Sequence, residues 1–262
     1  MSDSYDPAAV QRFAELLWRP GDVREVRILD LPRKATASGY FDDPARLAAA
    51  VAPYDGKGNM FLTYNPVDPA LMAREQGDRI AEWAKLTTSD PDIVSRRWLY
   101  VDVDADRPSG VSGTDAELAA ALDVARKVTG HLHDAGWGWA MALMSGNGHA
   151  LVYPVDLPND EESTRLVKGV LRHLQLFDTD KAHVDQSVFN PARISPLVGT
   201  LKVRVAPSRG GRIDGRSWCS SPRGSIPWRR ISSDGWCRPG SLRRTTSSTP
   251  APTPRRPPAG SG

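Results

Sequence analysis

The segment WLYVDVD at residues 98–104 carries two carboxylates, Asp102 and Asp104, inside an apolar run. Side chains alternate between the two faces of a β-strand, so both carboxylates would point to the same side, about 7 Å apart. Two such charges repel each other unless a cation lies between them. Hard divalent ions such as Mg²⁺ bind one or two carboxylates together with substrate phosphates, so this pattern suits phosphoryl or nucleotidyl transfer. The alternative is a strand that ends in an acidic turn, because the turn-forming segment DRPSG follows at residues 106–110.

The segment SGNG at residues 145–148 has a composition suited to binding an anion. Glycines allow a tight turn that presents backbone N–H groups, and the serine and asparagine side chains add hydrogen bonds. The residues expected to contact phosphate are Ser145, Gly146, Asn147 and Gly148. An ordinary Asn-Gly hairpin turn between two strands is the alternative.

Further along the chain, Asp185 follows a short apolar segment and is a candidate third carboxylate, although an aspartate after a strand often only forms a turn. Arg193, in the segment NPAR, comes soon afterwards and could bind a phosphate through its guanidinium. Lys202 and Arg204 would extend this basic wall, or serve only as surface charges.

Helices and strands interleave along the first 200 residues. Capping residues followed by helical spacing of apolar residues predict helices after Asp6, Asp43, Thr114 and Asp160, and the last of these would turn Leu166 inward with its apolar neighbours. A further helix is predicted over residues 69–83. The predicted strands are 23–29, 59–65, 98–104, 137–144 and 149–155, with a short apolar segment at 184–185. The pattern indicates one α+β or mixed α/β domain that ends near residue 205.

Residues from 205 onward are rich in Arg, Ser, Pro and Gly and lack periodicity, which predicts a disordered tail or an aberrant one, such as a shifted reading frame. From residue 202, one Lys, twelve Arg and two Asp give a net charge of +11, which leaves −8 for residues 1–201. The basic tail therefore accounts for the high isoelectric point, which is poor evidence that the folded part binds nucleic acid.

The composition, with 40% apolar and 25% charged residues, is ordinary for a soluble globular protein. No stretch approaches the ~18–20 apolar residues of a membrane span, and the N-terminus has no signal-peptide character, so we expect a cytoplasmic protein without membrane contact. Cys219 and Cys237 lie in the tail without the spacing of a metal-ligand pair.

Three ordered motifs, YVDVDADRPSG, SGNGHALVYPVDLPND and HVDQSVFNPARISPLVGT, closely resemble the primase–polymerase branch of the archaeo-eukaryotic primase superfamily, the forms found in mobile elements, phages and plasmids. The resemblance covers roughly residues 10–204. It implies a primase-like (RRM-like) α+β domain over residues 1–204, with a mixed sheet core flanked by helices, and a separate tail over 205–262.

The resemblance also implies a DNA primase/polymerase that joins nucleoside triphosphates on a single-stranded DNA template. Its catalytic and metal-binding carboxylates fall on Asp102, Asp104 and Asp185, with a two-metal site for Mg²⁺ or Mn²⁺. The nucleotide would be contacted by residues 145–148 and Arg193, and we expect Lys202 to contribute there.

Two departures from the family pattern bear on activity. The family usually has one residue between the last glycine of the second motif and a histidine, whereas here His149 follows Gly148 directly and Ala150 holds the usual position. We retain His149 as a nucleotide-binding candidate, although a shift of one residue on a strand turns a side chain to the opposite face. The basic segment that normally follows the third motif is not matched, and a helicase partner would be encoded separately or lost.

Two alternative functions remain open. A catalytically impaired nucleic-acid-binding remnant would account for both departures. A rolling-circle replication nuclease is suggested by His131-Leu132-His133, but that signature needs its histidines on a strand beside a tyrosine, and here they fall near the end of a predicted helix.

Overall fold

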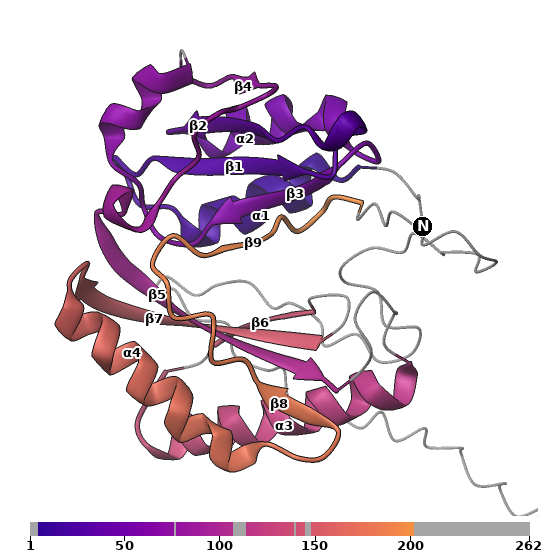
Figure 1. The fold of residues 1–262 in the computed structure, drawn as a ribbon, viewed down its shortest axis with the longest axis vertical. Coiled ribbons are helices and arrows are strands. Elements are labelled where there is room, and N and C mark those ends of the chain that lie inside the picture. Colours follow the sequence, from indigo (N-terminus) through magenta and orange to yellow (C-terminus); the bar gives the residue numbers. More distant parts are fainter. Residues whose placement is uncertain (1–4, 76, 107–113, 139, 145–147, 202–262) are drawn as a thin grey trace, which may run out of the picture. The chain divides into compact units, whose positions relative to one another are not determined.

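The computed structural model describes residues 5–201 except 76, 107–113, 139 and 145–147 (Figure 1). All of these residues belong to one structural unit. The predicted tail, the boundary at residue 204 and the candidates Ser145, Gly146, Asn147 and Lys202 lie outside the described residues. Within the described part of the chain, no helix is long and apolar enough to cross a membrane.

The first sheet has five strands in the order β4-β2-β1-β3-β9, and every pairing in it is antiparallel. Its strands are β1 (Arg24–Leu29), β2 (Ala37–Phe41), β3 (Asn59–Thr63), β4 (Ile80–Ala81) and β9 (Ile194–Pro196). Two helices, α1 (Pro7–Leu17) and α2 (Pro44–Val51), pack against each other and contribute buried residues to the main core. β9 lies near the C-terminal end of the described residues, so the strand that completes this sheet is far in sequence from the other four.

The second sheet has four antiparallel strands in the order β6-β7-β5-β8. Its elements follow one another as β5 (Ser95–Ala105), α3 (Asp115–Asp134), β6 (Met141–Met144), β7 (Gly148–Pro158), α4 (Glu161–Leu174) and β8 (Ala182–Val184). The β-α-β-β-α-β succession with β5 and β7 in the centre is the ferredoxin-like topology that RRM domains share. The expected α+β, RRM-like class is confirmed, with two antiparallel sheets in place of one mixed sheet.

Short 3₁₀ turns connect these elements: η1 (Pro32–Lys34), η2 (Ala52–Tyr54), η3 (Pro69–Glu75), η4 (Asp90–Asp92) and η5 (Gln175–Phe177). The prediction of one helix over residues 69–83 is therefore wrong, since among the described residues of this range only η3 and β4 form. Gly77 and Asp78 both have a φ of 51°, which is incompatible with a continuing right-handed helix.

The four predicted N-caps are confirmed, because the side chains of Asp6, Asp43, Thr114 and Asp160 each accept a hydrogen bond from a backbone N–H in the first turn. In α4, however, the prediction that Leu166 faces inward is wrong, because this residue is 53% exposed. The buried face of the helix instead runs through Val167, Leu171 and Leu174.

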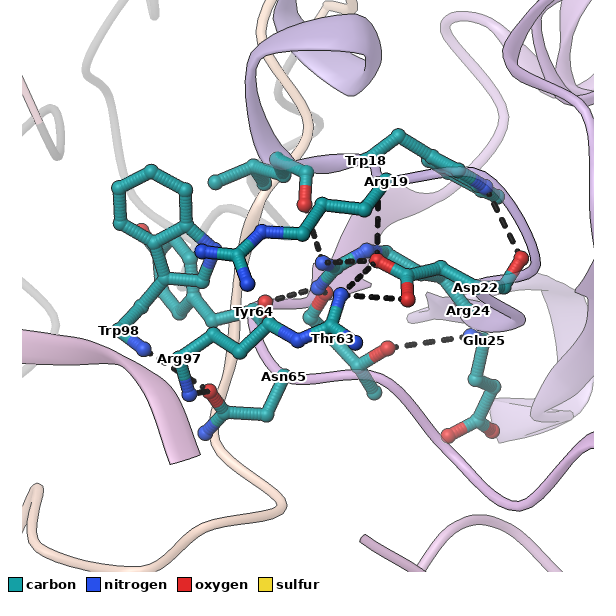
Figure 2. Close-up of polar contacts among 11 residues, drawn as sticks. Trp18, Arg19, Asp22, Arg24, Glu25, Thr63, Tyr64, Asn65, Arg97 and Trp98 are labelled. Carbon is teal, nitrogen blue, oxygen red and sulfur yellow. Dashed lines mark hydrogen bonds and ion pairs between the residues drawn. The ribbon is translucent and has the colours of Figure 1, made fainter. Parts of the chain in front are cut away.

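A buried polar network joins the first sheet to the start of β5 (Figure 2). Asp22, which is 4% exposed, receives two hydrogen bonds from Arg97 Nη1, at 2.5 and 2.6 Å, and contacts Arg24 Nη2 at 3.3 Å. The side chain of Asn65 accepts hydrogen bonds from the backbone N–H groups of Arg97 (2.9 Å) and Trp98 (3.1 Å). These contacts fix where β5 begins relative to β1 and β3.

Arg24 has no exposed surface and donates to the carbonyl oxygens of Leu17, Thr63 and Tyr64 as well as to Asp22. Burial lowers the pKa of Arg24 to about 9, and the charge of Asp22 acts in the opposite direction. A buried cation without a counter-charge is costly, so Asp22 is the residue on which this network depends.

Replacing Asp22 by Asn removes the negative charge and leaves Arg24 and Arg97 without a counterion. We expect the free energy of unfolding to fall by about 3–5 kcal/mol, as measured by urea denaturation. The matched control is Asp123→Asn, which breaks an exposed ion pair with Arg126 and should change stability by no more than ~1 kcal/mol. Equal losses in both variants would contradict a central role for the network.

Candidate metal centre

The three carboxylates Asp102, Asp104 and Asp185 meet in the structure, where each offers an oxygen and all three oxygens lie within 4.8 Å of one another. Asp102 and Asp104 share a face of β5 because they are two residues apart. Asp185 directly follows β8, the neighbour of β5, and its backbone N–H donates to the carbonyl of Asp102 at 2.9 Å. Strand pairing therefore brings a carboxylate from more than 80 residues further along the chain to the other two.

The carboxylate of Asp185 is oriented by its own turn. Ser187 donates its backbone N–H to Oδ1 at 2.7 Å and its hydroxyl to Oδ2 at 2.9 Å. These two bonds restrict rotation of the side chain and hold it beside the strand pair.

Asp102 is 8% exposed, and its Oδ1 is buried without a hydrogen bond from any described residue. Burial, with the charges of Asp104 and Asp185, raises the pKa of Asp102 from 3.8 to about 7, while Arg193 acts in the opposite direction. A buried carboxylate oxygen that lacks a donor, beside two further carboxylates, fits a hard divalent cation such as Mg²⁺ or Mn²⁺. The trio can therefore hold a metal ion.

Arg193 lies next to this trio. Its Nη2 is 3.9 Å from Asp102 Oδ2, its guanidinium lies 5.8 Å from the centre of the Tyr100 ring, and its buried Nε has no hydrogen-bond partner among the described residues. A partly exposed guanidinium beside a carboxylate trio that can hold a metal ion is suited to bind a phosphate group.

The segment that carries Arg193 is held by the first sheet. The amide of Asn65 donates to the carbonyl of Pro191 at 2.9 Å, and the backbone N–H of Tyr64 donates to the carbonyl of Arg193 at 3.3 Å. Tyr64 also packs on Tyr100, with ring centres 4.8 Å apart. Residues after β3 and residues of β5 thus position the arginine together.

Gly148 lies opposite Asp104 where β5 and β7 pair. A Cβ at this position would overlap the carbonyl oxygen of Val103 and would lie 3.1 Å from Asp104 Oδ1. Only glycine allows the two strands to approach this closely, so Gly148 allows β7 to pair with β5 directly beside Asp104.

His149, in contrast, is not brought to the carboxylates. It pairs with Val103, so the two side chains share the face of the sheet opposite to Asp102 and Asp104. That face is covered by α3, where burial lowers the pKa of His149 and the carbonyl of Leu118 acts in the opposite direction. The residue that faces Asp102 across the strands is Ala150.

One residue beside the trio, His183, is absent from the residues predicted from the sequence. His183 on β8 pairs with Asp104 and is exposed, while its neighbours Ala182 and Val184 are buried. Alternation along β8 therefore puts His183 on the same face as Asp104. The available signal was the apolar–polar–apolar order of AHV just before Asp185.

No protein-family model matches the sequence, and no curated protein matches it. Among solved structures, the polymerase domain of ligase D from Mycobacterium tuberculosis, determined in complex with DNA, matches over 75% of this chain and 75% of that chain. The sequence identity is 16% and the TM-score 0.44. A similarity this distant establishes neither a family nor an activity.

The Gly148→Ala variant tests how closely β7 supports Asp104. The added methyl group must push β7 away from β5, so we expect a loss of ~1–3 kcal/mol in stability and weaker Mn²⁺ binding, measured by urea unfolding and titration calorimetry. The control is Gly169→Ala in α4, where a Cβ meets nothing within 4 Å and should stabilise the helix by ~0.5–1 kcal/mol. Unchanged Mn²⁺ binding in Gly148→Ala would show that the spacing is not needed.

The raised pKa of Asp102 predicts a pH-dependent stability in the presence of a chelator. Between pH ~4 and about 7 the folded chain keeps a proton on Asp102 that the unfolded chain has released. This contribution to the free energy of unfolding therefore decreases as pH rises through that range. Urea denaturation at several pH values should show the decrease in the unmodified chain and a smaller one in Asp102→Asn; parallel pH profiles would contradict the assignment.

Proposed function

We propose that this chain is a metal-dependent nucleotidyltransferase of the primase–polymerase type, which synthesises or extends primers on single-stranded DNA. The observation that carries the proposal is the meeting of Asp102, Asp104 and Asp185 within 4.8 Å. The three motifs that resemble mobile-element primases support the reaction type, because each of these carboxylates falls on an acidic position of that resemblance.

In this proposal the carboxylate trio binds Mg²⁺ or Mn²⁺, which would activate the primer 3′-hydroxyl and stabilise the triphosphate and the leaving pyrophosphate. The residues of the chain hold the carboxylates in position and supply their negative charge. Asp102 and Asp104 are fixed by the β5–β7 pairing, and Asp185 is oriented by Ser187.

Binding of the nucleoside triphosphate is assigned to Arg193 and to the SGNG segment. Arg193 Nη2 lies 3.9 Å from Asp102 Oδ2 and the side chain is partly exposed, which supports a contact with a phosphate oxygen. The glycines, serine and asparagine of the SGNG segment suit phosphate binding, and its last residue, Gly148, pairs with Asp104. Lys202 would make a further contact with a phosphate. A separately encoded helicase would supply the single-stranded template.

A second candidate function is a binding remnant that retains affinity for single-stranded DNA and has lost nucleotide binding. The observation that favours it is the register at β7, where Ala150 faces Asp102 and His149 lies on the helix side. Titration calorimetry with a nucleoside triphosphate and Mn²⁺ separates the two functions, because a remnant would bind DNA but not the nucleotide.

The activity is tested by template-directed primer extension with Mg²⁺ or Mn²⁺. We expect Asp102→Asn and Asp185→Asn each to reduce the rate by at least ~10²-fold, since loss of a metal ligand removes several kcal/mol of transition-state stabilisation. Asp123→Asn, an exposed carboxylate on α3, is the matched control and should keep the full rate. Synthesis that persists in an Asp102→Ala/Asp104→Ala double variant would overturn the site assignment.

A further inference from the structure

Two histidines meet at the C-terminal ends of α3 and α4, and the proposed reaction uses neither of them. His131 Nε2 and His173 Nε2 are 2.9 Å apart, and the ring centres are 5.1 Å apart. His131 also packs on Phe177, with ring centres at 5.1 Å. Each histidine lies in the last turn of its helix, so the contact joins the two helices at their C-terminal ends.

The pair borders a surface groove with a volume of about 630 Å³. Its walls combine apolar side chains, among them Trp137 and Val170, with the charged groups of Glu162 and Arg165. The groove keeps the facing nitrogens accessible to a small ion or ligand from solvent.

The distance between the two nitrogens is close to that of a shared metal ion. Two imidazole nitrogens bound to one tetrahedral Zn²⁺ at ~2.0–2.1 Å are separated by about 3.3 Å. A side-chain rotation that moves Nε2 of the exposed His173 by ~0.4 Å would reach this separation. In the absence of metal one Nε2 must carry a proton to donate to the other, and a bound cation takes the place of that proton.

We propose that His131 and His173 form a binding site for a borderline divalent transition-metal ion, of which Zn²⁺ is the reference, that links α3 to α4. The site differs in chemistry from the carboxylate trio, because imidazole nitrogens select Zn²⁺, Cu²⁺ or Ni²⁺ whereas carboxylate oxygens alone suit Mg²⁺ and Mn²⁺. The proposal is independent of the proposed nucleotidyl transfer.

Two histidines leave further coordination positions of the ion open. Among the described residues, the only group of three or more potential metal ligands is the carboxylate trio. Water, or a carboxylate group of a small molecule bound in the groove, would complete the coordination shell.

The test is titration calorimetry of ZnCl₂ into the full chain in which competing ligands have been removed by Asp102→Asn, Asp104→Asn, Asp185→Asn, His183→Gln, Cys219→Ser and Cys237→Ser. We expect one Zn²⁺ per chain, no comparable heat with MgCl₂, and a Zn²⁺-dependent increase in the melting temperature. Adding His131→Gln or His173→Gln should weaken Zn²⁺ binding by at least ~10-fold and abolish the increase in melting temperature.

The matched control is His133→Gln in the same background, since His133 lies in the same turn of α3 as His131. It should bind Zn²⁺ like the parent. Circular dichroism without metal verifies that each variant is folded, and the ring proton signals of His131 and His173 should move in the NMR spectrum when Zn²⁺ is added. A parent that binds no Zn²⁺, or binding that survives both single substitutions, would overturn the proposal.

Discussion

Mutual repulsion among three carboxylates is the constraint on which the site depends. Asp102, Asp104 and Asp185 are held within 4.8 Å by backbone pairing and not by attraction between their side chains. The repulsion and the burial of Asp102 appear together in its raised pKa. The nearby Arg193 offsets part of this charge, and a divalent cation would offset more. The strands thus impose an unfavourable arrangement that a bound metal ion relieves.

The opposite end of β5 supplies the rigidity that such an arrangement requires. Asp22 binds Arg97 at the start of the strand, and Asn65 links the backbone of Arg97 to the carbonyl of Pro191. A single amide therefore connects the strand that carries two carboxylates with the segment that carries Arg193. Because these groups are buried and paired, they favour one register and disfavour slippage.

Local signals in the sequence were sufficient for much of the fold and for the Asp102–Asp104 pair, whereas Asp185 was assigned to the site through the family resemblance. Capping residues gave the helix starts, and alternation along residues 98–104 placed two carboxylates on one face. The helix expected after Pro69 failed because backbone conformations with positive φ at Gly77 and Asp78 override an apolar pattern. His183 and the His131–His173 contact were not foreseen, because each depends on partners far away in the sequence and on strand or helix pairing that no local pattern encodes.

The return of β9 to the first sheet has a consequence for folding. β3 has β1 on one side and β9 on the other, so β3 remains an edge strand until residues 194–196 have been synthesised. The N-terminal half emerging from the ribosome would thus expose unpaired backbone groups while the second sheet is still being made. Pairing over so long a sequence separation is slow, and it makes closure of the first sheet a late event that also delivers Arg193 to its place.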